Sequence, residues 1–203
     1  MAAQGATRTP PEGSGVKGML PGRSTRSMTA ATIVRLGDGR SGLVRRASPD
    51  DAEGITALVN TVGAEGRFVL RDRATWTLEE ERQTLAAADG TVSVFLVAEL
   101  SERICGMMNL SRGRWPKNSH VAEFGMSCLP ECRRIGLGAA LLAQGIEWAR
   151  DGGVRKLALE VFASNEAAIS LYRKMGFEVE ARLKGEFVID GAPVDGLRMA
   201  LWL

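Results

Sequence analysis

The order of elements along the chain predicts an α/β fold, with a mixed sheet that carries helices on its faces. From Leu43 onward, strand-length and helix-length segments follow one another as β-α-α-β-β-β-α-β-α-β-β. The composition, 45% hydrophobic and 25% charged, is ordinary for a globular protein. At 203 residues, the chain is long enough for one domain with an appendage.

The first 40 residues differ from the rest in composition. They contain seven glycines, three prolines and eight serines or threonines, which gives too little apolar surface to offset the cost of ordering the chain. We therefore expect 1–40 to be a disordered extension and 41–203 to be the folded domain. An organellar transit peptide, or a start codon placed ahead of Met19 or Met28, would also account for this segment.

Helix starts are marked by capping residues. Ser48 precedes Pro49, a pairing typical of a helix N-terminus. Thr77 and Glu80 have the spacing of a capping box. Gly152-Gly153 suits a left-handed end for the helix that begins at Leu137. These signals place helices after Ser48, after Thr77 and over 137–150, and a fourth is expected over 165–175.

The strands are recognised from short apolar segments bounded by turn residues. Asp190-Gly191 is a strong hairpin turn signal, and a second hairpin is expected around Leu100 to Arg103. The expected strands are 43–47, 94–99, 104–111, 121–129, 157–161, 177–189 and 194–203.

The junction between the strand 121–129 and the helix 137–150 has the character of an anion-binding site. A helix begins with N–H groups that have no partner within the helix, and its dipole adds partial positive charge. Gly136 and Gly138 let the backbone take a positive φ and approach a ligand closely, and Arg133 and Arg134 add charge. A Walker loop is absent from the chain, and the dinucleotide fingerprint fails at Leu141, so neither explains this loop.

Two motifs together resemble the GNAT superfamily of N-acetyltransferases. Arg133-x-x-Gly136-x-Gly138 is similar to motif A, the loop that holds the acetyl-CoA pyrophosphate, and Asn165 to Phe177 is similar to motif B, N-x-x-A-x-x-x-Y-x-x-x-G-F, at every fixed position. The resemblance extends over 43–203. The C-terminal hairpin looks like the branch with bacterial L-amino-acid, ribosomal-protein and polyamine acetyltransferases.

The resemblance implies a mostly antiparallel sheet that is splayed between its fourth and fifth strands, with acetyl-CoA as co-substrate. The residues that it assigns to cofactor binding lie on the strand before the loop, in the loop, and on the helix of motif B. They are Met126, Ser127, Cys128, Arg133, Arg134, Ile135, Gly136, Leu137, Gly138, Ala139, Asn165 and Tyr172.

Tyr172, the only tyrosine in the chain, is the candidate general acid. A phenol is protonated at neutral pH and can give its proton to a departing thiolate. The family's acid stands at this motif position. An aromatic ring that packs on the sheet is the other interpretation, and Asn165 is equally a helix cap.

Glu123 is the candidate general base, because a carboxylate within an apolar strand has its pKa raised by burial and can accept a proton from the ammonium. A structural partner or solvent exposure would remove this role. His120 is another candidate proton acceptor. Cys128 invites an acyl-cysteine intermediate, but the family characteristically transfers directly in a ternary complex.

We therefore predict an acetyl-CoA-dependent N-acetyltransferase that acts on a primary amine, with a small amine or amino acid favoured. A protein N-terminal acetyltransferase and a non-catalytic acetyl-CoA sensor are the alternatives. Three cysteines without C-x-x-C spacing and one histidine argue against a disulfide framework and a metal site, and indicate a cytoplasmic protein. We expect no nucleic-acid or membrane partner, and the family makes a homodimer plausible.

Overall fold

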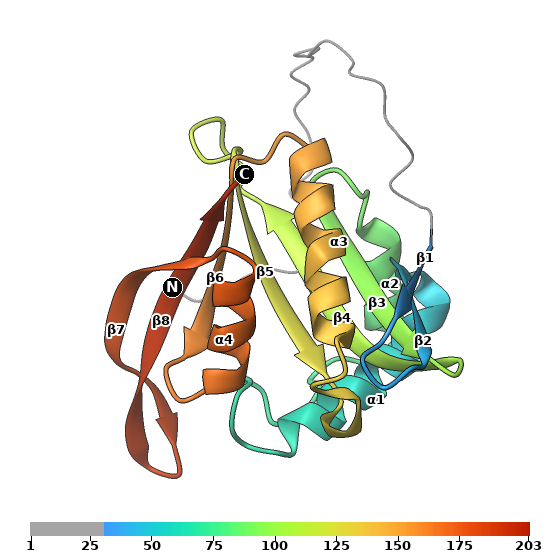
Figure 1. Cartoon of the computed structure of the whole chain (residues 1–203), viewed down its shortest axis with the longest axis horizontal. Helices are drawn as coiled ribbons and strands as arrows, with labels where there is room; N and C mark the ends of the chain where they lie inside the picture. The colour runs from blue at the N-terminus through green and yellow to red at the C-terminus, as the bar shows by residue number, and fades with distance from the viewer. Residues whose placement is uncertain (1–30) are drawn as a thin grey trace.

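The computed structural model describes residues 31–203, which form one sheet with helices on both faces (Figure 1). The strands are β1 (Thr32–Arg35), β2 (Ser41–Arg46), β3 (Ser93–Leu100), β4 (Arg103–Arg112), β5 (Val121–Cys128), β6 (Lys156–Phe162), β7 (Glu178–Ile189) and β8 (Ala192–Trp202). The helices are α1 (Ala52–Gly63), α2 (Leu78–Ala87), α3 (Leu137–Asp151) and α4 (Glu166–Lys174), with short 3-10 turns η1 (Pro49–Asp51) and η2 (Pro130–Cys132).

The sheet has the order β1-β2-β3-β4-β5-β6-β8-β7. Among the described strands, only β5 and β6 pair in parallel, and every other neighbouring pair is antiparallel. The prediction of a mixed, mostly antiparallel sheet flanked by helices is therefore confirmed.

Strands β5 and β6 separate soon after they begin to pair. Their register covers only Val121 to Glu123 on β5, opposite Lys156 to Ala158 on β6. Beyond Glu123, β5 stays paired with β4 as far as Cys128, and β6 stays paired with β8 as far as Phe162. The two strands diverge in Figure 1. The fourth and fifth strands expected from the sequence, 121–129 and 157–161, are β5 and β6, so the predicted splay is confirmed. It leaves main-chain groups of β5 facing a gap instead of a neighbouring strand.

The helices divide between the two faces of the sheet. Helices α3 and α4 lie in front of the sheet in Figure 1, and α1 and α2 lie behind it. Because successive side chains of a strand point to opposite faces, Phe124 and Met126 face α3 and α4, whereas Glu123 faces the other side. We call these the front face and the back face. The front face contains the larger core, which includes Leu141 and Leu157.

Local signals in the sequence account for the helix starts and the turns. Thr77 and Glu80 form the predicted capping box, in which the Glu80 N–H donates to Thr77 Oγ1 (3.2 Å) and the Thr77 N–H donates to Glu80 Oε2 (2.7 Å). Gly153 takes the left-handed φ of 71° that ends α3, and Asp190 and Gly191 make the hairpin turn with φ values of 50° and 78°.

One boundary predicted from composition was misplaced. Strand β1 lies inside the segment expected to be disordered, and it pairs with β2 from Thr32↔Val44 to Arg35↔Ser41. The domain therefore begins before residue 41. The glycines at 37 and 39, which lowered the hydrophobicity of this segment, belong to the β1–β2 turn. Residues 1–30 lie outside the described residues, and the prediction for them stays a prediction.

Candidate active site

The loop between β5 and α3 has the backbone geometry of an anion-binding turn. Gly136 is the N-cap of α3 with φ 95°, and Arg134 also has a positive φ of 64°. The Ala140 N–H donates to the Gly136 oxygen at 3.0 Å. The N–H groups of Leu137, Gly138 and Ala139 precede that bond, so they are the helix's unsatisfied donors. Together with the helix dipole, they favour an anion at this end of α3.

Space at the two glycines fits a ligand that approaches the backbone. A Cβ placed on Gly136 would meet nothing within 4 Å, so the loop is open on that side. A Cβ placed on Gly138 would lie 3.5 Å from Met126 Cε, 3.6 Å from Leu171 Cδ2 and 3.7 Å from Cys128 Sγ. The start of α3, the end of β5 and one side of α4 therefore converge at Gly138. The structure brings together predicted cofactor residues from β5 and α3, and it places Leu171 of α4, which was not predicted, beside them.

Arg133, which was expected to add positive charge beside the loop, has its guanidinium paired with a carboxylate. Its Nη1 donates to Glu65 Oε2 at 2.8 Å, its Nη2 forms a second contact with Glu65 Oε1, and its Nε donates to the Cys128 oxygen at 2.9 Å. The hydrogen bond from Arg133 holds the pKa of Glu65 below its usual range. The side chain thus ties the loop after α1 to the loop before α3. Arg134 is exposed and remains the cation beside Gly136.

Ile135, Leu137 and Asn165, which were also predicted to bind the cofactor, have structural roles. The Ile135 oxygen accepts a hydrogen bond from the Gly37 N–H at 2.8 Å, which attaches the β1–β2 turn to the loop. Leu137 is fully buried and anchors the start of α3 in the core. Asn165 caps α4, because its Oδ1 accepts a hydrogen bond from the Ala168 N–H at 3.2 Å. The alternative capping role of Asn165 is therefore present.

Tyr172 is a buried phenol on the front face. It is 6% exposed and lies in a cluster of three rings, with centroids 5.8 Å from Phe124 and 5.9 Å from Phe177. Burial raises the pKa of Tyr172 well above its usual value, and the nearby Cys128 thiol adds to the rise. The phenol is therefore protonated at neutral pH, as a proton donor requires.

Cys128 ends β5 next to the gap. Burial raises the pKa of its thiol to about 11, and the positive charge of Arg133 offsets this only in part. At neutral pH the group is a thiol, which is a poor nucleophile compared with a thiolate.

Glu123 does not lie in the apolar environment from which its base role was predicted. Its side chain on the back face is 33% exposed and forms an ion pair with Arg198 of β8. The expectation of an isolated, buried carboxylate is therefore wrong for Glu123. The reason is that Arg198 lies 75 positions away along the chain and comes into reach only through the strand order β5-β6-β8. His120 contributes a main-chain oxygen, which accepts hydrogen bonds from the N–H groups of Arg155 and Lys156.

A second carboxylate on the back face is partly buried and has one oxygen without a partner. Glu160 lies on β6, two residues beyond the last pair with β5, and its Oε1 is buried with no hydrogen-bond partner. Burial raises the pKa of Glu160, and the negative charge of Glu186 raises it further. Sequence analysis missed this residue, although the signal was present as one charged residue in Leu157-Ala-Leu-Glu-Val161.

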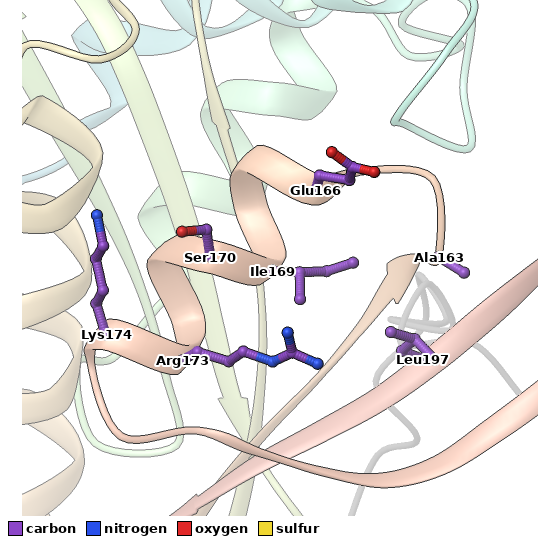
Figure 2. A pocket seen from close by; sticks show the side chains of 7 residues that line it. All are labelled: Ala163, Glu166, Ile169, Ser170, Arg173, Lys174 and Leu197. Atoms are coloured by element: carbon purple, nitrogen blue, oxygen red, sulfur yellow. The ribbon is translucent and has the colours of Figure 1, made fainter.

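Two surface hollows accompany the site. One, of about 340 Å³, lies beside the Glu123–Arg198 pair on the back face and is also lined by Ser111, Arg112 and Asn118. The other, of about 510 Å³, lies along α4 (Figure 2). Arg173 and Ile169 line it on the side of α4 toward Leu197 of β8, and Lys174, which also lines it, points toward α3. The residue of α4 that lies near Gly138 is Leu171, which does not line this hollow.

Within residues 31–203, no helix is long and apolar enough to cross a membrane. The same residues contain no group of three or more His, Cys, Asp or Glu side chains placed to hold a metal ion.

Residues 64–177, more than half of the chain, match the family model described as "Acetyltransferase (GNAT) family". Among curated proteins, the chain is 32% identical over 123 residues to L-amino acid N-acetyltransferase AaaT of Escherichia coli K12, covering 59% of this chain and 67% of that protein. It is 38% identical to the E. coli [ribosomal protein bS18]-alanine N-acetyltransferase over 38% of this chain and 53% of that protein. The match to E. coli spermidine N(1)-acetyltransferase is 37% identical over 40% of this chain and 44% of that protein.

Solved structures share the fold. An acetyltransferase of the GNAT family from Streptococcus pneumoniae superposes with a TM-score of 0.75 and 30% identity, covering 80% of this chain and 99% of the other. YncA from Salmonella typhimurium, solved with its cofactor acetyl-CoA, has a TM-score of 0.73 and 24% identity, covering 80% of this chain and 94% of the other. At that identity, the second likeness concerns the fold alone.

Proposed function

The chain belongs to the GNAT family of acetyltransferases, and from this membership we propose that it transfers an acetyl group from acetyl-CoA to a primary amine by direct attack in a ternary complex. A small amine or amino acid is the proposed acceptor. The observation that carries the proposal is the gap between β5 and β6, which has a protonated phenol on its front face and an unpartnered carboxylate on its back face.

The donor site lies at the start of α3. The N–H groups of Leu137, Gly138 and Ala139 would hold the pyrophosphate, with Gly136 opening the turn and Arg134 supplying charge. Main-chain groups of Met126, Ser127 and Cys128 border the gap and would bind the pantetheine arm and the acetyl oxygen. The bound acetyl-CoA supplies the activated acyl group.

Tyr172 is the proposed general acid. Its hydroxyl group keeps its proton at neutral pH, and its ring is fixed by Phe124 and Phe177, so the group is held in one orientation. In the reaction, the phenol would give its proton to the sulfur as the C–S bond breaks. Cys128 acts electrostatically on the phenol, which supports a position of the Tyr172 hydroxyl group near the end of β5.

Glu160 is the proposed general base, in place of Glu123. An amine attacks only after it loses its ammonium proton, and a carboxylate with a raised pKa accepts such a proton more readily than an ordinary one. Glu160 lies on β6, the strand that borders the gap, and its buried Oε1 has no hydrogen-bond partner, whereas Glu123 is already paired with Arg198. The acid and the base would then act from opposite faces of the gap.

Direct transfer fits the state of Cys128 better than an acyl-cysteine intermediate does. Its pKa of about 11 leaves very little thiolate at neutral pH. We therefore assign Cys128 no covalent role.

A turnover screen with matched variants tests the proposal. The full chain is incubated with acetyl-CoA and separate pools of amino acids, polyamines and short peptides, and the released CoA thiol is measured with a thiol-reactive dye. We expect turnover with the amino acids or small amines, in keeping with the likeness to an L-amino acid N-acetyltransferase. Preference for the peptides would favour a protein N-terminal acetyltransferase. Acetyl-CoA binding without turnover in any pool would contradict the enzyme assignment and indicate a sensor.

The base assignment is tested with the acceptor that the screen selects. Glu160→Gln is expected to lower kcat by about 100-fold or more, the usual contribution of a general base. The control is Glu178→Gln, an exposed glutamate at the start of β7, for which we expect a change of less than about threefold. Equal activity of Glu160→Gln and wild type would remove the base role.

A further inference from the structure

Arg198 lies between two carboxylates on the back face of the sheet. It stands directly opposite Glu160 in the β6–β8 register, so Glu160 is its cross-strand neighbour. Its guanidinium nevertheless forms an ion pair with Glu123, one strand further away on β5. The Oε1 of Glu160 has no hydrogen-bond partner. The nearest arginine is thus held away from the carboxylate that faces it.

Other groups around Glu160 are acidic or apolar. A Cβ placed on Gly196 would lie 3.5 Å from Glu160 Oε1, 3.4 Å from Glu186 Cβ and 3.1 Å from a ring carbon of Phe187. The glycine therefore allows β7 to bring Glu186 beside Glu160. Among the described residues, 31–203, the charged groups that act on Glu160 are Glu186 from β7, Glu123 from β5 and Arg198 from β8, and Arg198 is the one cation of these three.

Resting on the proposed role of Glu160, we propose that Glu123 is a positioning residue, which holds the Arg198 guanidinium and so prevents it from pairing with the general base. Without that restraint, Arg198 would pair across the strands with Glu160, as opposite charges commonly do in a sheet. A carboxylate in such a pair is a weaker proton acceptor, because the cation favours its charged form.

The charge balance agrees with this role. Burial raises the pKa of Glu160, Glu186 and Glu123 raise it further, and Arg198 lowers it. The influence of Arg198 would grow if its guanidinium turned from Glu123 to Glu160. Glu123 therefore acts on the base in two ways, through its own charge and through its hold on Arg198, and the second effect exists only while Arg198 is present.

The two effects separate in a double-mutant cycle. Glu123→Gln keeps the shape of the side chain but removes its charge, so Arg198 is released. In the Arg198→Gln background, the same change removes only a neighbouring negative charge. Positioning therefore predicts a large fall in the pKa of Glu160 in the first case and a small one in the second.

The pKa of Glu160 is measured by NMR on the full chain labelled with ¹³C at the glutamate carboxyl carbon. The Glu160 signal is identified by its loss in Glu160→Gln. We expect Glu123→Gln to lower the pKa of Glu160 by about one unit or more, and Arg198→Gln to raise it. In the Arg198→Gln background, Glu123→Gln is expected to lower it by less than about half as much.

Equal falls in the two backgrounds, or no fall with Arg198 present, would overturn the proposal. Glu180→Gln is the control, because it breaks the Lys156–Glu180 ion pair on the same sheet and leaves Arg198 untouched. Arg198→Met provides the same cycle if Arg198→Gln does not fold. The readout needs no acceptor, so a failure here is distinct from a failure of Glu160→Gln to reduce turnover.

Discussion

The two faces of the gap between β5 and β6 are built from different kinds of group. On the front face, the donor side, the groups are main-chain N–H donors at the start of α3, a partly buried thiol and a buried phenol. On the back face, the groups are charged side chains from β5, β6 and β8. The front face would bind acetyl-CoA. The back face would determine which amine is accepted.

This difference indicates that cofactor binding depends on a local sequence motif, whereas the groups on the back face depend on contacts between residues far apart in the chain. A helix start with glycines is a local feature of nine or ten residues, so the chain carries it as a motif. The Glu123–Arg198 pair joins residues 75 positions apart, and it exists only because of the strand order.

The largest expected effect is on the front face, at Tyr172. Tyr172→Phe removes the proton donor and keeps the ring between Phe124 and Phe177. We expect kcat to fall by about 10²- to 10⁴-fold, the usual range for general acid catalysis. The dissociation constant of acetyl-CoA, measured by calorimetry, is expected to change less than about threefold. A kcat equal to that of wild type would show that the phenol serves packing alone.

Gly136→Asp tests the main-chain part of the front face. An Asp at this left-handed position is strained, and its charge would repel a phosphate, so we expect acetyl-CoA to bind at least about 100-fold more weakly by calorimetry. Gly153→Asp is the matched control at the other end of α3, since Gly153 is also left-handed and a Cβ there meets nothing within 4 Å. Similar loss of affinity in both variants, or in neither, would remove the anion-binding role.

The Glu65–Arg133 pair joins the loop after α1 to the loop before α3. Breaking it is expected to have a small effect on KM for the acceptor. Both side chains are partly exposed, so the pair contributes at most about 1 kcal/mol. We expect Glu65→Gln to raise KM for the acceptor up to about fivefold, because the loop after α1 loses its ion pair with Arg133. Affinity for acetyl-CoA is not expected to fall. Glu131→Gln, which breaks the exposed Arg103–Glu131 pair beside the same loop, is the control.

The smallest expected effect is at Cys128. Because its thiol is protonated at neutral pH, Cys128→Ala is expected to change kcat less than about threefold. The rate of alkylation by iodoacetamide in wild type is expected to rise with pH up to about 11, as the thiolate forms above the ordinary range for a cysteine. A 100-fold loss of kcat would restore the acyl-cysteine mechanism.

Much of the fold was predictable from the sequence, because capping residues, turn dipeptides and apolar segments are local signals. Thr77 and Glu80, Gly153 and Asp190-Gly191 each have the predicted role. Strand β1 was not found, because a four-residue edge strand next to two glycines has a weak signal and is stabilised by its pairing with β2.

The site was predictable where a residue type acts through its own position, and not where it acts through a partner. Gly136 has the expected left-handed backbone, and the ring of Tyr172 packs against Phe124 as its alternative interpretation expected, while its role as an acid stays a prediction. Arg133 was expected to add charge at the loop and Glu123 to be a buried base, but each pairs with a residue far away in sequence. Glu160 had the same signal as Glu123, a charge in an apolar strand, and only the fold distinguishes the paired carboxylate from the unpaired one.

The central claim is that reaction takes place in the gap between β5 and β6, with Tyr172 on one face and Glu160 on the other. A crystal structure with a bisubstrate analogue, an amine joined through an acetyl linker to the sulfur of CoA, tests it most directly. We predict that the pyrophosphate lies against the start of α3, the sulfur beside the Tyr172 hydroxyl and the amine nitrogen on the side of Glu160. An analogue bound instead in the hollow along α4, lined by Ile169 and Arg173, would contradict the account.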